Sequence, residues 1–165
     1  MQLRAVTMSI FALALLAACG GTTSSNGGAS PSPVASASPT QAAAGETIAV
    51  ANDAKLGQIL VDEKGITVYL FVADKGTAST CYTSCAQIWP PLLTTGAPQA
   101  GAGATASLLG TTTRTDGKVQ VTYGGHPLYY FVQDKRVGAT TGQGVDGFGG
   151  LWWVVSPTGA AITTK

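Results

Sequence analysis

Two short stretches of the chain share one pattern of apolar and polar positions. Residues 67–75 read TVYLFVADK and residues 127–135 read PLYYFVQDK, and both fit the framework Tyr-x-Phe-x-x-Asp-Lys. Side chains alternate between the two faces of a β-strand, so Val68, Leu70 and Val72 share one face of the first stretch and aromatic residues share the other. Neither face is polar, which predicts a strand covered on both sides. The framework residues are Tyr69, Phe71, Asp74, Lys75, Tyr129, Phe131, Asp134 and Lys135.

Other short apolar runs, bounded by turn residues, predict further strands and tight turns. Gly65 and the pair Gly124–Gly125 suit hairpin turns because glycine tolerates the positive φ that such turns need. Helix is scarce, and the best candidate covers residues 83–88, with Pro90–Pro91 ending it. The predicted strands are 47–50, 57–62, 67–72, 118–123, 128–132 and 151–155, with a further candidate at 160–164, a loop at 94–105 and a long hairpin loop at 142–150.

These elements predict an all-β or β-dominated fold in which two repeated hairpin units pack as one pseudo-twofold domain. The folded region is expected at 46–165, with the units at about 56–93 and 117–156 and one short helix after the first unit. Each unit is too small to bury its apolar face alone, so a single domain is expected.

The N-terminus predicts export and lipidation. Residues 1–18 combine the positive Arg4 with an apolar run too short for an ordinary membrane span. The run ends in Leu-Ala-Ala-Cys, which resembles the bacterial lipobox, and this resemblance implies cleavage before Cys19 and acylation of its thiol and amine. Residues 19–45 then form a lipid anchor and a Gly/Ser/Pro tether that is expected to be disordered.

Charge and motifs exclude several classes of function. Without Arg4 the chain has eight Lys and Arg (nine minus one) against eight Asp and Glu, so no basic surface for nucleic acid is expected. No nucleophile elbow, zinc-protease motif or nucleotide fingerprint occurs in the sequence. We therefore expect no catalytic residues, no cofactor and no metal, although the sequence leaves enzymatic activity undecided.

Cys81 and Cys85 are the two cysteines that remain once Cys19 is set aside. An exported protein permits a disulfide, and a spacing of four residues can bring the two Cα atoms within bonding range. A small structural disulfide is the leading interpretation. A redox-active dithiol and a metal site with further ligands, for which His126 is the sole histidine, remain alternatives.

Asp74 and Asp134 each follow a predicted strand, where an Asp commonly accepts backbone N–H groups and fixes a turn. The alternative is a paired-carboxylate site, which requires the two repeats to bring both residues together.

The tryptophans and His126 are possible binding residues. Trp152 and Trp153 point to opposite sides of a strand, so we expect one in the core and the other nearer the surface. Core packing is the leading interpretation of the aromatic side chains, and stacking on a sugar ring or a protein partner is the alternative. The possible binding residues are Trp89, Trp152, Trp153 and His126.

Taken together, these motifs resemble a family of predicted bacterial lipoproteins described as a secreted repeat of unknown function. The resemblance rests on the two Tyr-x-Phe-x-x-Asp strands, the Cys81-x-x-x-Cys85 pair with the following Trp-Pro-Pro-Leu, and the Gly-His-Pro-Leu at 125–128. It covers roughly residues 46–156 and implies an exported, membrane-attached repeat domain with no established reaction. The second copy departs from the family pattern because it lacks the cysteine pair and carries a Gly-rich loop before Trp152 and Trp153.

Three hypotheses for function follow. The leading one is a membrane-anchored, non-catalytic binding or structural module of the cell envelope, whose partners are the membrane through acyl chains on Cys19 and an envelope protein or glycan. The second is an envelope redox or electron-transfer component that uses Cys81 and Cys85 or a bound cofactor. The third is a glycan-binding domain that uses an exposed tryptophan. Gly20 is not the Asp associated with inner-membrane retention, which favours the outer membrane in a cell with two membranes.

Overall fold

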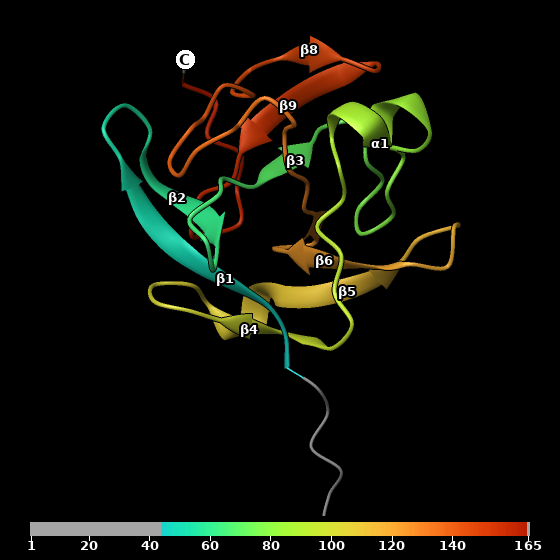
Figure 1. Ribbon diagram of the computed structural model, residues 1–165, viewed down its shortest axis with the longest axis horizontal. Coiled ribbons are helices and arrows are strands. Elements are labelled where there is room, and N and C mark those ends of the chain that lie inside the picture. Colours follow the sequence, from blue (N-terminus) through green and yellow to red (C-terminus); the bar gives the residue numbers. More distant parts are fainter. Residues whose placement is uncertain (1–43, 165) are drawn as a thin grey trace, which may run out of the picture. The chain divides into compact units, whose positions relative to one another are not determined.

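The computed structural model describes residues 44–164, in which strands are joined by turns and loops (Figure 1). The β-dominated class predicted from the sequence is confirmed, with three small sheets and one short α-helix in this part of the chain. The predicted signal peptide at 1–18, Cys19 and the tether up to residue 43 lie outside the described residues. The last two residues assigned to the tether, Ala44 and Gly45, instead begin the first strand.

The first sheet has the order β2-β1-β4. Strand β1 (Ala44–Asp53) pairs antiparallel with β2 (Gly57–Asp62) and parallel with β4 (Ala97–Ala100). The loop predicted for 94–105 is therefore partly wrong. Its Gly, Ala and Pro composition gives no sign of a strand. Strand β4 forms because the edge of β1 that faces away from β2 offers backbone N–H and C=O groups for pairing.

The second sheet joins the two repeats, with the order β3-β9-β8. Strand β3 (Tyr69–Phe71) from the first repeat pairs antiparallel with β9 (Gly150–Val154) from the second, and β9 turns back from β8 (Asp146–Gly147). The hairpin loop predicted for 142–150 is thus shorter than expected, because residues 146–147 and 150 belong to the strands of a tight hairpin. Its turn residues, Phe148 and Gly149, both have positive φ.

The third sheet contains β5 (Leu109–Thr113), β6 (Val119–Tyr123) and β7 (His126–Pro127) in that order. A 3-10 helix (Ala106–Leu108) precedes β5, and helix α1 (Ser84–Ile88) follows the Tyr-x-Phe strand of the first repeat, within the range 83–88 predicted for it. Gly124 and Gly125 have φ of 58° and 84°, the geometry expected for their hairpin turn.

The strand predicted for 128–132 is reduced to an isolated bridge at Tyr129, which pairs with both Tyr69 and Pro91. The opposing segment contains Pro90 and Pro91, which lack N–H groups, so no complete ladder can form there. The candidate strand at 160–164 is likewise reduced to a single bridge between Val155 and Ala161.

Reciprocal backbone hydrogen bonds relate the two repeats by a pseudo-twofold axis. The N–H of Tyr69 donates to the carbonyl of Tyr129 at 2.9 Å, and the N–H of Tyr129 donates to the carbonyl of Tyr69 at 3.0 Å. Farther from the axis, Leu60 donates to Val155 and Val121 donates to Leu92, each at 2.8 Å. Each repeat therefore completes the backbone pairing of the other.

The core lies on both sides of β3, as the pattern of its residues predicts. Tyr69 and Phe71 belong to one buried cluster, and Leu70 and Val68 belong to the other. Val72 is an exception, because it is 56% exposed just beyond the end of β3.

Candidate functional site

The repeat motif forms a reciprocal contact between the two halves. The hydroxyl of Tyr69, in the first repeat, donates to Asp134 Oδ2 of the second at 2.5 Å. The hydroxyl of Tyr129, in the second repeat, donates to Asp74 Oδ2 of the first at 2.7 Å. Both tyrosines are fully buried. Each tyrosine thus binds the aspartate of the other repeat and not the aspartate of its own repeat.

The other oxygen of each carboxylate fixes a turn within its own repeat. Asp74 Oδ1 accepts from the backbone N–H of Thr80 at 2.7 Å and from its hydroxyl at 2.9 Å. Asp134 Oδ1 accepts from the N–H of Thr141 at 2.9 Å and from its hydroxyl at 2.5 Å. Each carboxylate thus accepts three hydrogen bonds from the protein, which is the geometry of a turn-fixing residue.

Burial and the neighbouring carboxylates keep the phenols of Tyr69 and Tyr129 protonated. Burial raises the pKa of Tyr69 far above its usual range, and the hydrogen bond to Asp134 adds to the rise. Burial also raises the pKa of Tyr129, and the charge of Asp74 adds to it. The pKa of Asp74 is raised by burial, although hydrogen bonds from Thr80 and Tyr129 act against the rise. Both tyrosines therefore remain neutral donors at ordinary pH.

Four aromatic rings stack across the pseudo-twofold axis. Trp89 and Trp152 lie parallel at the centre, with ring centroids 4.0 Å apart and planes 3° apart. Phe71 stacks on the outer face of Trp152 at 4.0 Å, and Phe131 stacks on the outer face of Trp89 at 4.2 Å. Each phenylalanine therefore stacks on the tryptophan of the opposite repeat. Aromatic pairs packed in this way add stability beyond the area that they bury.

All three tryptophans are buried, with Trp89 at 1%, Trp152 at 0% and Trp153 at 6% exposure. The expectation that either Trp152 or Trp153 lies nearer the surface is therefore wrong, because both are packed in the core. Trp153 belongs to the second core cluster, which covers the side of β9 that was expected to lie near the surface. His126 is half-buried in β7, where it closes the hairpin turn after Gly125.

Cys81 and Cys85 form the predicted disulfide, with their Cα atoms 5.2 Å apart. Cys81 is fully buried and Cys85 is 6% exposed, so little of the bond is accessible to a thiol in solution. The place of Cys81 in the second repeat is taken by Gly142, one residue after the threonine that binds Asp134. The bond joins a turn of the first repeat to helix α1 beside the aromatic stack.

Arg114 is a buried residue that the sequence did not single out. Its guanidinium donates to the carbonyl of Cys81 at 2.7 Å, to Gln120 Oε1 at 2.6 Å and to Ser79 Oγ at 2.9 Å. It also stacks over the ring of Tyr82 at 4.3 Å, and its Nε lies 3.5 Å from Asp116. This network ties the disulfide turn to β6.

The geometry leaves these residues little capacity for chemistry on an external molecule, because their polar groups already bind one another in the core. Among residues 44–164 no group of three His, Cys, Asp or Glu side chains could hold a metal ion. Within the same range no helix is long and apolar enough to span a bilayer.

Comparison with known families supports the family resemblance. A family model described as a secreted repeat of unknown function matches residues 50–93 and 110–156, which together make up more than half of the chain. The two matched segments contain the two Tyr-x-Phe-x-x-Asp strands, so the resemblance noted in the sequence is confirmed. No curated protein and no solved structure matches the chain.

Proposed function

The chain belongs to the family of secreted repeats of unknown function, and on that premise we propose that it is a lipid-anchored, non-catalytic binding or structural module of the bacterial cell envelope. Membership in a family of secreted repeats indicates an extracytoplasmic location. In the proposal, acyl chains on Cys19 hold the protein to a membrane, the outer one where there are two. Two or three acyl chains are needed because a single chain anchors only marginally.

The observation that carries the proposal is the reciprocal use of the repeat motif. Tyr69 and Tyr129 donate to the aspartate of the opposite repeat, and Trp89 and Trp152 stack on each other across the axis. These chemically distinctive side chains hold the two halves together. This arrangement favours a rigid domain carried on a tether over a catalytic centre.

The alternative function, electron transfer through Cys81 and Cys85, is less well supported. A reactive thiol needs access to solvent and a pKa that favours the thiolate. Both cysteines are buried, and the carbonyl of Cys81 is held by Arg114. These contacts favour a structural disulfide.

Mass spectrometry of the mature protein tests the proposal. The full chain is produced in a bacterium that processes lipoproteins and is purified from its membrane fraction. We expect an N-terminus at Cys19 that carries the mass of two or three acyl chains, and loss of membrane association in Cys19→Ser. A Thr22→Ser variant, which retains the cysteine, serves as the control and should stay in the membrane fraction. An unacylated mature protein would contradict the anchoring.

The same preparation tests the alternative. Alkylation before reduction should add no mass, because Cys81 and Cys85 are bonded to each other. If thiols label without reductant, or if a cofactor purifies with the protein, the electron-transfer function takes precedence over the binding module.

A further inference from the structure

An open groove lies on the surface between the start of β1 and the β5–β6 hairpin. Its volume is about 550 Å³, and its walls come from residues 44–46, Glu63, 93–95 and 118–119. Pockets that hold small ligands typically have volumes of roughly 300–1,000 Å³. The groove is therefore large enough for a ligand of a few residues.

Hydrogen bonds between its walls fix the shape of the groove. The hydroxyl of Thr94, a buried residue, accepts from the N–H of Glu46 at 3.2 Å and donates to the carbonyl of Gly96 at 2.8 Å. The N–H of Thr94 donates to the carbonyl of Val119 at 3.0 Å. Thr94 thus joins β1 to β6, and a ligand would meet a site that is already formed.

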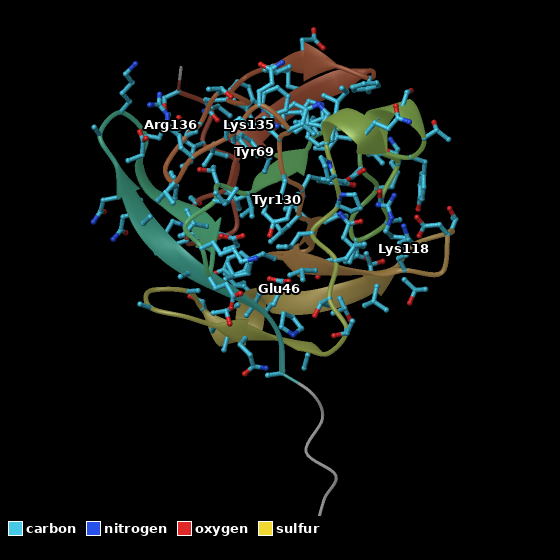
Figure 2. All side chains as sticks on the ribbon, in the orientation of Figure 1. Glu46, Tyr69, Lys118, Tyr130, Lys135 and Arg136 are labelled. Atoms are coloured by element: carbon cyan, nitrogen blue, oxygen red, sulfur yellow. A yellow bond between two sulfur atoms is a disulfide. The ribbon has the colours of Figure 1, made fainter. Side chains whose placement is uncertain are left out.

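The charges of the groove are separated. Two carboxylates, Glu46 and Glu63, belong to its lining together with the ammonium group of Lys118. In Figure 2 Glu46 lies below Tyr130 near the middle of the view, whereas Lys118 lies toward the end of the β5–β6 hairpin. In the described part of the chain, 44–164, the single ion pair joins Arg114 and Asp116, so the groove charges do not pair with one another.

The end of the groove near Glu46 and Glu63 is electronegative. Burial raises the pKa of Tyr130, and the charges of Asp62, Glu46 and Glu63 raise it further. Asp62 is itself held by the Tyr130 hydroxyl, which donates to Asp62 Oδ2 at 3.0 Å. A cationic group would be favoured at this end, and an anionic group beside Lys118.

We propose that the groove binds a short peptide segment, with its ammonium group at the end formed by Glu46 and Glu63 and its carboxylate at Lys118. This inference rests on the proposed function as a binding module. The lining contains no aromatic side chain on which a sugar ring could stack, and Leu93 and Val119 add apolar surface suited to short side chains. A free peptide and the peptide part of an envelope polymer share this chemistry.

Calorimetric titration of the full mature chain, kept in detergent micelles, tests the proposal. The probe is lysyl-alanyl-alanine with free ends, compared with the same peptide amidated at its C-terminus and with a neutral disaccharide. We expect saturable binding of the free peptide, and binding weakened about fivefold by amidation because one partly exposed charge pair is lost. Fragments of envelope polymer that carry such peptides, compared with the same polymer stripped of peptide, distinguish the two sources.

Variants of the groove give the sharper test. Glu46→Gln and Lys118→Gln should each weaken binding about fivefold, whereas Lys135→Gln, which removes an exposed lysine outside the lining, should not. Lys118→Glu should reverse the preference, so that the amidated peptide binds better than the free one. Absence of saturable binding up to about 10 mM, equal binding by all variants, or binding of the disaccharide alone would overturn the proposal. None of these outcomes bears on the mass of Cys19, so the groove and the anchor are tested separately.

Discussion

Tyr69 and Tyr129 link the stability of the fold to pH. Both phenols have a pKa raised by burial above the ordinary value of 10.0, whereas the unfolded chain ionises them near that value. Above pH 10 the unfolded state therefore loses protons that the folded state keeps. The contribution of each buried phenol to the free energy of unfolding is therefore fully present below pH 10. As the pH rises above 10, the free energy of unfolding falls by about 1.4 kcal/mol per pH unit for each phenol.

Tyr69→Phe should make this alkaline fall less steep. One fewer proton is released on unfolding, so the slope of the free energy of unfolding against pH should decrease by about 1.4 kcal/mol per pH unit above pH 10. The variant should also be less stable at neutral pH by about 1–3 kcal/mol, because Asp134 loses a buried donor. Urea denaturation followed by tryptophan fluorescence between pH 8 and about pH 12 measures both effects.

Tyr82→Phe is the matched control, because the pKa of Tyr82 is lowered in the fold. Removing this phenol should not reduce the alkaline slope. If Tyr69→Phe leaves the slope unchanged, the phenol ionises in the folded state and the buried Tyr69–Asp134 contact does not hold it.

Arg114 shows what the sequence could not indicate at the scale of one residue. It stands beside Thr115 and Asp116 in a polar stretch, where a charged side chain normally faces solvent. In the fold it is 4% exposed, and besides the nearby Gln120 and Asp116 its guanidinium contacts Cys81 and Ser79, more than 30 residues away. These distant partners, which the local sequence does not reveal, complete the hydrogen bonding that makes a buried charge tolerable.

At the scale of elements, Gly142 occupies the place in the second repeat that Cys81 fills in the first. A Cβ added at Gly142 would lie 2.8 Å from a ring carbon of Trp89 and 2.9 Å from the ring of Tyr69. Both rings are packed in the core and have little room to move. Gly142→Ala should therefore lower the free energy of unfolding by about 1–3 kcal/mol, as overpacking does in other cores.

Gly147→Ala provides the comparison. Gly147 lies in β8, five residues from Gly142, and a Cβ added there would meet nothing within 4 Å. Its effect on denaturation should stay within about 0.5 kcal/mol. Equal effects of the two substitutions would show that loss of backbone flexibility, and not the contact with Trp89, determines the cost.

The elements that could be predicted from the sequence are those whose own residues show a local pattern, such as alternation of side chains or a pair of turn-forming glycines. Strand β3 follows from the alternation in TVYLF, and the turn at Gly124–Gly125 follows from two residues suited to positive φ. Strand β4 carries no such signal, because it forms through a parallel pairing with β1 that is distant in the sequence. The pairing of each tyrosine with the aspartate of the other repeat was hidden for the same reason, since each repeat also contains an aspartate of its own.

At the scale of the whole molecule, the two repeats share one core and one set of backbone pairings. The amide of Leu60, in the first repeat, donates to Val155 in the second, and the amide of Val121, in the second, donates to Leu92 in the first. Neither hydrogen bond can survive if either half unfolds. The described domain should therefore open as a single cooperative unit, in which a change confined to one half is felt in both.

Removal of the disulfide tests this cooperativity. The bond spans a separation of four residues in the first repeat, so Cys81→Ala with Cys85→Ala should lower the free energy of unfolding by about 2 kcal/mol. Native-state hydrogen exchange should show the same loss of protection at the amides of Leu60 and Val121, although Val121 lies in the repeat without cysteines. Wild-type protein with its disulfide reduced is the control and should lose protection at both amides to a similar extent. If Leu60 loses protection while Val121 keeps it, the halves unfold separately, and the reciprocal contacts of the tyrosines and tryptophans do not couple them.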